Sequence, residues 1–225
     1  MTPSLLFVHS PLVGPSSLRR LAQVCRTAGR AVALPDLTSA TRASPVRWET
    51  FIEIAVAAGA RLHGPTAVVA HSGAGAFLPA IGAAIDDLAA LVFVDAVIPP
   101  DDGPHRTSDA MADLLDSKTV DGVLLPWLEW WPGHVVEQVL PDRVDRRTLA
   151  ADMPRLPRGL YDEDVPVPSG WTDWPCRYLK LSAAYEQEYA TAEERGWPSL
   201  SIDGAHLSTH TEPDVVRAAI DMLLE

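Results

Sequence analysis

The stretch from Thr66 to Gly75, TAVVAHSGAG, decides the fold of this 225-residue chain. Its first half is a continuous apolar run, which is typical of a strand buried on both faces of a parallel sheet. Its second half consists of very small residues around Ser72, which predicts a sharp turn from the strand into a helix. Small residues at positions 70 and 74 let strand and helix approach closely, although this turn usually carries glycine there. The stretch therefore predicts a serine hydroxyl that projects above the edge of a sheet.

Similar short apolar runs alternate with longer amphipathic stretches on both sides of this turn, as in parallel βαβ units. The runs that predict strands are Leu5–His9, Ala31–Leu37, Ala67–His71, Leu91–Asp95, Arg177–Leu181 and Ser199–Ile202. The stretches that predict helices are Ser16–Gly29, Arg47–Leu62, Gly75–Ile85, Glu186–Arg195 and Asp214–Leu224. The sequence thus predicts an α/β protein with a doubly wound, mostly parallel six-stranded sheet, whose ligands bind beyond the carboxyl ends of the strands.

One segment interrupts the alternation. Between Ile98 and Pro175 there is no convincing strand, but there are many prolines, an acidic helical stretch at Thr107–Ser117 and a cluster of tryptophans. We interpret residues 1–225 as one domain with residues 98–175 inserted as a helical cap. The cluster, Trp127, Trp130 and Trp131, is expected either to line an apolar substrate pocket or to anchor the cap to the body of the protein.

The overall composition excludes several classes of function. Thirty acidic and 18 basic side chains give a formal net charge of −12, which disfavours binding to nucleic-acid phosphates and anionic lipid surfaces. The first ten residues lack a basic start and a long apolar region, and no run approaches the ~20 apolar residues that cross a bilayer. The two cysteines and the scattered histidines have no metal-ligand spacing. We therefore expect a cytoplasmic protein, monomer or homodimer, that acts on a small molecule without metal or cofactor.

Three motifs, in this order along the chain, resemble the α/β-hydrolase superfamily. The strand LLFVH followed by SPL at residues 10–12 looks like the family's first-loop His-Gly region, AHSGAG looks like its nucleophile turn, and DGAH at residues 203–206 looks like its histidine loop. The resemblance covers nearly the whole chain. Because the chain opens directly on the strand before the first of these loops, the resemblance implies a reduced six-stranded sheet without the family's two leading antiparallel strands.

The resemblance implies that Ser72 is a nucleophile and that His206 is the base that activates it, since an unassisted hydroxyl is a poor nucleophile at neutral pH. A third group must hold the imidazole in the correct tautomer. Asp95, at the end of the strand ALVFVD, and Glu186, after the strand RYLKL, are both candidates, and we favour Asp95. Each has a structural alternative, because Asp95 can bond loop amides and Glu186 can complement a helix dipole.

An acyl-transfer intermediate also needs two preorganised donors for its oxyanion. The resemblance gives one of them to the Gly73 backbone N–H. The second normally comes from the position of Pro11, which has no N–H, so that Leu12 N–H or the Ser10 hydroxyl must substitute. Because of this departure at Pro11, the sequence is also compatible with a non-hydrolytic reaction.

The leading hypothesis is a serine hydrolase that cleaves a carboxylic ester, thioester or lactone of a largely apolar small molecule through an acyl-enzyme. A second hypothesis keeps the fold but assigns a non-hydrolytic, lyase-type or other biosynthetic reaction, in which a hydroxyl such as that of Ser10 contacts the substrate. A third is a catalytically silent protein that only binds a ligand on this fold.

Overall fold

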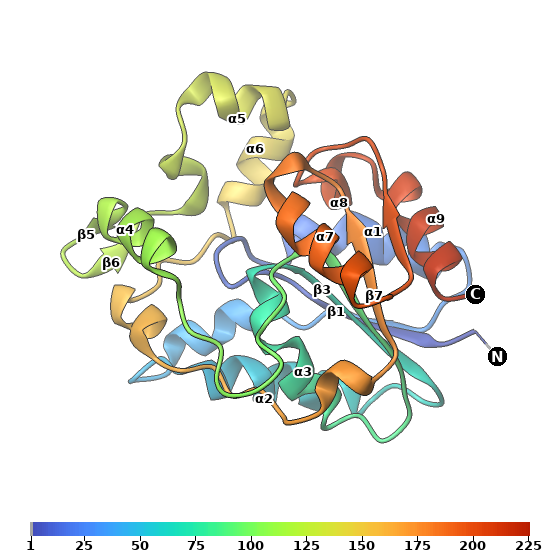
Figure 1. The fold of residues 1–225 in the computed structure, drawn as a ribbon. Coiled ribbons are helices and arrows are strands. Elements are labelled where there is room, and N and C mark those ends of the chain that lie inside the picture. Colours follow the sequence, from blue (N-terminus) through green and yellow to red (C-terminus); the bar gives the residue numbers. More distant parts are fainter. Residues whose placement is uncertain (1) are drawn as a thin grey trace.

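A six-stranded sheet forms the centre of the protein (Figure 1). The computed structural model describes residues 2–225. The strands lie in the order β2-β1-β3-β4-β7-β8, and every neighbouring pair is parallel. Their bounds are β1 Ser4–Val8, β2 Val32–Ala33, β3 Thr66–Ser72, β4 Leu88–Ala96, β7 Cys176–Lys180 and β8 Ser199–Ser201. The predicted doubly wound, mostly parallel six-stranded sheet is confirmed.

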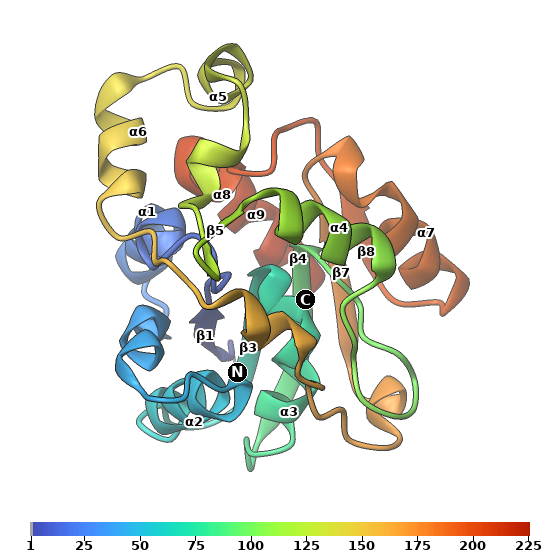
Figure 2. The ribbon, with the colours of Figure 1, turned by 90° about the vertical axis from the view of Figure 1, so that its left-hand side faces the viewer.

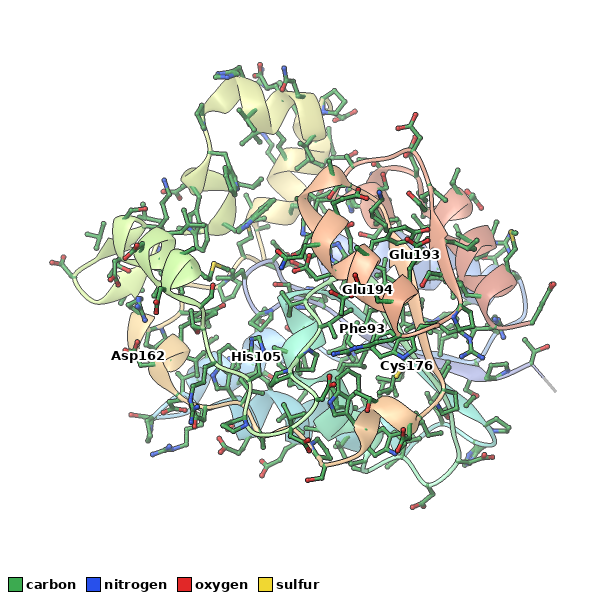
Figure 3. The ribbon with its side chains drawn as sticks, in the orientation of Figure 1. Phe93, His105, Asp162, Cys176, Glu193 and Glu194 are labelled. Carbon is green, nitrogen blue, oxygen red and sulfur yellow. The ribbon has the colours of Figure 1, made fainter. Side chains whose placement is uncertain are left out.

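Helices cover both faces of the sheet (Figures 1 and 2). Those outside the insertion are α1 Ser16–Thr27, α2 Trp48–Gly59, α3 Leu78–Gly82, α7 Glu186–Glu194, α8 Ser208–Thr211 and α9 Pro213–Leu223. Successive strand residues point to opposite faces, so Leu5 and Phe7 pack with α1 and α9, whereas Leu6 and Val8 join the cluster that contains α2 and α3. The cluster with α2 and α3 also includes Phe93 and Cys176 from the neighbouring strands β4 and β7 (Figure 3). Burial on both faces explains why the strand sequences are continuously apolar.

The chain reverses its direction of winding between β1 and β3. From β1 it passes through α1 to the edge strand β2, and then returns through α2 to β3 on the other side of β1. The loops after β1 and β3 therefore leave the sheet in opposite directions, which opens a crevice at the carboxyl ends of these strands. Ser10 and Ser72 both lie at this position.

Residues 98–175 lie between β4 and β7. They contain α4 Asp109–Ser117, α5 Gly133–Val139 and α6 Arg143–Ala150, with short 3-10 turns at Trp127–Trp130, Arg158–Asp162 and Trp171–Asp173. The residues just after α6 contact the start of α1, where Asp152 Oδ2 accepts hydrogen bonds from Ser16 N–H (2.9 Å) and Ser16 Oγ–H (2.6 Å). Many of its apolar side chains, such as Leu115, Leu124 and Trp171, belong to the same cluster as α2 and α3, whereas Leu140, Leu149 and Met153 form a smaller cluster with Val13 and Leu207.

The expectation of no strand in this segment is wrong in one place. Strands β5 (Thr119–Val120) and β6 (Val123–Leu124) form a small antiparallel hairpin. Between them Asp121 and Gly122 have positive φ values of 51° and 77°, the backbone that a two-residue hairpin turn requires. An Asp-Gly pair is a recognised signal for such a turn.

Two other elements are shorter than expected. The strand predicted over Ala31–Leu37 covers only Val32–Ala33, because Pro35 has no N–H and the Leu37 N–H is donated to His9 Nε2 (3.0 Å). The helix predicted over Gly75–Ile85 begins as a 3-10 turn at Gly73–Phe77 and becomes α-helical only at Leu78–Gly82. Over residues 2–225, every helix is too short or too polar to cross a membrane.

Candidate active site

Ser72 lies at the strained turn that the sequence predicts between β3 and the following helix. Its φ and ψ are 61° and −133°, a backbone conformation that non-glycine residues rarely adopt. Three residues later, a Cβ on Gly75 would lie 2.0 Å from the Val97 carbonyl oxygen, so the chain can pass β4 at this distance only with glycine. The close passage forces the tight turn and directs the Ser72 side chain into the crevice.

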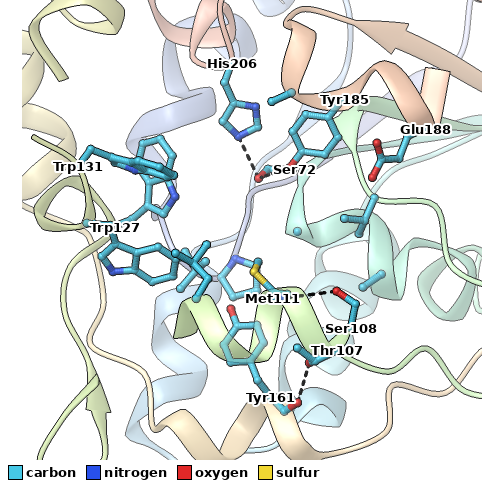
Figure 4. Close-up of a pocket in the computed structure, with 18 of the residues that line it drawn as sticks. Ser72, Thr107, Ser108, Met111, Trp127, Trp131, Tyr161, Tyr185, Glu188 and His206 are labelled. Atoms are coloured by element: carbon cyan, nitrogen blue, oxygen red, sulfur yellow. Dashed lines mark hydrogen bonds between the residues drawn. The ribbon is translucent and has the colours of Figure 1, made fainter. Parts of the chain in front are cut away.

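A continuous chain of hydrogen bonds joins Ser72 to His206 and Asp95. Ser72 Oγ lies 3.0 Å from His206 Nε2, and His206 Nδ1 lies 2.8 Å from Asp95 Oδ2 (Figure 4 shows the first of these contacts). The three side chains come from the end of β3, the loop after β8 and the end of β4. Although they are far apart in sequence, the parallel sheet brings all three to one edge.

Asp95 is fully buried and held in place by the next strand. Its Oδ1 accepts hydrogen bonds from Leu181 N–H (2.9 Å) and Ser182 N–H (3.0 Å), and its Oδ2 accepts one from Ser182 Oγ–H (2.6 Å). Burial alone would raise the pKa of Asp95, but the hydrogen bonds from His206, Ser182 and Leu181 and the charge of His206 together hold this pKa below its usual value. Asp95 is therefore an ionised acceptor for His206 Nδ1–H.

Glu186, the other predicted acid, lies elsewhere. It is exposed, begins α7 and pairs with the Lys180 ammonium group. Its place in the first turn fits the alternative that the sequence left open, a carboxylate that complements the helix dipole. The structure thus brings Asp95, and not Glu186, to His206.

The histidine next to the nucleophile packs against His206. His71 Nε2 lies 2.8 Å from the His206 carbonyl oxygen, and the two rings stack with centroids 4.6 Å apart. Burial lowers the pKa of His71 to about 3, with a smaller contribution from the His206 charge, so His71 is neutral. It is placed to hold the His206 loop. Among residues 2–225, no three His, Cys, Asp or Glu side chains are close enough to hold a metal ion.

The loop after β1 lies opposite Ser72 and is fixed by His9. The His9 ring is fully buried, accepts the Leu37 N–H through Nε2 and contacts the Ser10 carbonyl through Nδ1 (2.9 Å). Burial lowers its pKa to about 4, so the ring is neutral and Nδ1–H donates to that carbonyl. The Leu12 N–H makes a long contact of 3.4 Å with Ser10 Oγ. The Leu12 N–H, one of the two predicted oxyanion donors, is therefore directed at a neighbouring hydroxyl.

A cavity of about 600 Å³ lies between Ser72 and the inserted segment (Figure 4). Ser72, Gly73, Leu12 and His206 line its base, and its wall is largely apolar. The apolar side chains on the wall include Met111, Leu114, Trp127, Leu128, Trp131, Val135, Val136 and Val139.

The three tryptophans of the predicted cluster differ in their roles. All three line the cavity, but Trp130 is only 4% exposed and donates its Nε1–H to the Leu125 carbonyl oxygen (2.7 Å), as an anchor does. Trp131 is 37% exposed, and the Trp127 ring lies 6.0 Å from that of His206. Ser10, predicted to contact substrate, is 2% exposed and does not line this cavity.

Two polar residues on the α7 side of the cavity, Tyr185 and Glu188, were not predicted from the sequence. The Tyr185 hydroxyl lies 3.2 Å from Ser72 Oγ, and Glu188, one turn further along α7, lines the same side (Figure 4). Burial raises the pKa of Glu188. Both follow β7, where the sequence predicted only an acid at Glu186. A tyrosine in the loop beyond a buried strand was the available signal, because such loops point toward the crevice.

Comparisons with known proteins concern the fold. No protein-family model and no curated protein matches the sequence. The structure is similar to a pyrethroid hydrolase from Sphingobium faniae JZ-2 (TM-score 0.76, 16% identity, 100% of this chain and 98% of that chain). It is also similar to tomato methylketone synthase I (0.73, 13%, 98% and 96%) and to the thioesterase domain of the curacin biosynthetic pathway (0.61, 14%, 97% and 90%). Since these identities are low, the likeness concerns the backbone arrangement. The chain has the α/β-hydrolase fold.

Proposed function

We propose that the protein is a serine hydrolase that cleaves a carboxylic ester, thioester or lactone through an acyl-enzyme. The observation that carries the proposal is the hydrogen-bond chain from Ser72 Oγ through His206 to Asp95, built on a strained turn at the base of an apolar cavity. A strained backbone conformation persists only where its surroundings impose it, and such sites are concentrated where chemistry occurs.

In this proposal Ser72 Oγ attacks the carbonyl carbon while its proton passes to His206 Nε2. Asp95 accepts the Nδ1–H bond and thereby keeps Nε2 free to act as the base. His206 then returns the proton to the leaving group, and a water molecule repeats the sequence on the acyl-enzyme. The Gly73 N–H donates to the oxyanion, and the Leu12 N–H, whose 3.4 Å contact with Ser10 Oγ is long, adds at most a weaker second bond. No metal or cofactor enters these steps.

The cavity supports a substrate with a largely apolar group. Its volume of about 600 Å³ lies within the range of small-molecule sites, and its wall of tryptophan and aliphatic side chains excludes water from that group. Two of the similar folds belong to a pyrethroid hydrolase and a thioesterase domain, which supports an acyl-transfer reaction. We further propose that residues 98–175 act as the cap that determines the substrate, in a cytoplasmic protein.

Two observations favour hydrolysis over the alternatives. The lyase-type hypothesis depends on a Ser10 hydroxyl that contacts substrate, and Ser10 is 2% exposed, does not line the cavity and contacts Leu12 N–H at 3.4 Å. The silent-binding hypothesis has no use for a strained Ser72 that is hydrogen-bonded to a histidine–aspartate pair.

The test is covalent labelling with a fluorophosphonate, followed by intact-protein mass spectrometry. Wild type is expected to gain one adduct, Ser72→Ala to gain none, and His206→Ala to react at a greatly reduced rate. Ser201→Ala, which removes an exposed serine of the edge strand β8, is the matched control and should label like wild type. Absence of an adduct on folded wild type, or an adduct that persists in Ser72→Ala, would overturn the proposal.

A further inference from the structure

Tyr185 touches the reacting oxygen without any role in the mechanism described so far. It ends the short 3-10 turn Ala183–Tyr185 between β7 and α7. Its hydroxyl lies 3.2 Å from Ser72 Oγ, and its ring stacks almost parallel on that of His206, with centroids 5.2 Å apart and an angle of 11° (Figure 4). The contact is therefore to the nucleophile itself, and the stacked ring limits how the hydroxyl can move.

The neighbouring hydrogen bonds determine which group donates in this contact. Asp95 Oδ2 accepts His206 Nδ1–H, so in the tautomer that acts as the base the free electron pair of the imidazole lies on Nε2. That electron pair accepts the only proton of the Ser72 hydroxyl. Ser72 Oγ can then only accept from Tyr185, and the Tyr185 hydroxyl must be the donor.

The Tyr185 hydroxyl stays protonated throughout the range in which a hydrolase works. Burial raises its pKa to about 12, and the hydrogen bond with Ser72 only partly opposes this effect. A phenol in this state is a neutral donor that is not lost to ionisation. It can stabilise negative charge without giving up its proton.

The backbone of this site supplies fewer donors than an acyl-transfer reaction needs. The position that follows Ser10 is Pro11, which has no N–H, and the next N–H, of Leu12, is directed at Ser10 Oγ. Gly73 N–H, in the residue after Ser72, remains as a backbone donor. An additional donor close to the reacting carbon would compensate for this shortage.

We infer that Tyr185 is a catalytic residue whose hydroxyl donates a hydrogen bond to an oxygen on the tetrahedral carbon formed when Ser72 attacks the substrate. The inference rests on the proposed serine-hydrolase function. As Oγ forms its bond to the carbonyl carbon, the electron pair of the C=O double bond moves to oxygen and the Ser72 proton passes to His206 Nε2. Tyr185 keeps its own proton and moves its hydrogen bond from Oγ to an oxygen two bonds away. Collapse of the intermediate expels the leaving group, which takes the proton from His206.

The experiment compares Tyr185→Phe with wild type and with Tyr189→Phe on p-nitrophenyl butyrate. Phenylalanine keeps the ring that stacks on His206 and removes only the hydroxyl. For Tyr185→Phe we expect kcat to fall on the order of 100-fold with little change in KM, because the lost bond exists in the transition state. Tyr189 lies one turn further along α7, where its ring packs against Tyr178 and Lys180, and its variant should retain wild-type kcat.

A second measurement separates catalysis from packing. Phenylboronic acid forms a tetrahedral adduct with an activated serine, so its affinity should fall about tenfold in Tyr185→Phe and stay unchanged in Tyr189→Phe. Equal kcat and equal boronate affinity in Tyr185→Phe and wild type would overturn the inference, because the ring alone would then suffice. Fluorophosphonate labelling of wild type makes the two failures distinct: a labelled wild type with an unaffected Tyr185→Phe variant refutes only the role of Tyr185, whereas an unlabelled wild type refutes the serine mechanism and the inference with it.

Discussion

The sheet edge and the inserted segment face each other across one cavity, but they are built in different ways. At the sheet edge, Asp95 is fully buried, and the strands that carry it and Ser72 are buried over almost their whole length. In the segment 98–175 the helices are short, and α5 (Gly133–Val139) has no buried residue, although three of its valines line the cavity. At the sheet edge, buried neighbours fix the side chains in one arrangement, whereas no residue of α5 is buried.

This difference shows how the proposed enzyme meets two separate requirements in two parts of the molecule. Groups that must be positioned to within a fraction of an ångström lie at strand ends, where packing and hydrogen bonds restrict them. Groups that only need to exclude water and contact apolar surface lie on a segment that tolerates change. Substitutions at the edge should therefore abolish chemistry or folding, and substitutions in the segment should change selectivity.

The largest effect is expected from Asp95→Asn. The asparagine amide donates to His206 Nδ1, which shifts the ring proton to Nε2 and leaves no acceptor for the Ser72 proton. We expect kcat to fall about 10⁴-fold in steady-state ester hydrolysis. Glu186→Gln is the matched control and should stay within about twofold of wild type. A large loss in Glu186→Gln together with an active Asp95→Asn would reverse the assignment of the acid.

Acid should destabilise the edge through its two buried histidines. The folded pKa values of His9 and His71 are about 4 and about 3, below the unfolded value of 6.5, so this part of the stability is complete above pH 6.5 and is lost as pH falls toward 4. At pH 5 each histidine costs about 2 kcal/mol relative to pH 7, or about 4 kcal/mol together. Urea unfolding at the two pH values measures this difference. In His9→Gln, which cannot titrate, the difference should fall by about half, and an unchanged difference would contradict the assignment to His9.

Gly75→Ala should break the edge through packing alone. The added methyl group would lie 2.0 Å from the Val97 carbonyl oxygen, so β4 or the turn must move. We expect the free energy of unfolding to fall by about 3 kcal/mol or more. Gly73→Ala is the control, because its methyl group would meet only Ser10 Oγ, at 3.5 Å, and should cost less than about 1 kcal/mol. Similar losses in the two variants in chemical denaturation would show that the close approach at Gly75 is unimportant.

The smallest effect is expected on the other side of the cavity, from Trp131→Ala. Trp131 is 37% exposed, so its loss should change stability little, but an apolar acyl chain would lose contact area worth about 1 to 1.5 kcal/mol. We expect kcat/KM to fall about tenfold for p-nitrophenyl decanoate and to stay unchanged for p-nitrophenyl acetate. Val120→Ala, an exposed change in the same segment outside the cavity, should affect neither ester. Equal losses on both esters would place Trp131 outside the acyl contact.

The contrast between the two regions also explains how far the sequence could be interpreted. The strands AVVA and ALVFV are apolar at every position because they are buried on both faces, and this local signal predicts both their existence and their parallel arrangement. The turn at Ser72 was also predictable from a local signal, because the close passage of strand and helix requires a run of small residues.

What the sequence did not predict depends on contacts between distant segments. The strand after Ala31 is shortened partly by Pro35, a local signal, and partly by the bond between His9 Nε2 and Leu37 N–H, which depends on a residue far away in the sequence. The position of Tyr185 depends on how the loop after β7 lies over His206. The burial of Ser10 and its contact with Leu12 N–H likewise depend on tertiary structure, so the sequence could not decide between them as second oxyanion donors.

The adjacent positions of Ser72 and Asp95 have a consequence for how the chain folds. Both lie within the single βαβ unit Thr66–Ala96, whereas His206 lies 111 residues beyond Asp95. Contacts that are close in sequence require less loop-closure entropy and form sooner than distant ones. We expect the serine and the carboxylate to be in place while the chain is still incomplete. During synthesis the serine would thus lack its base until the segment that carries His206 has docked against the sheet.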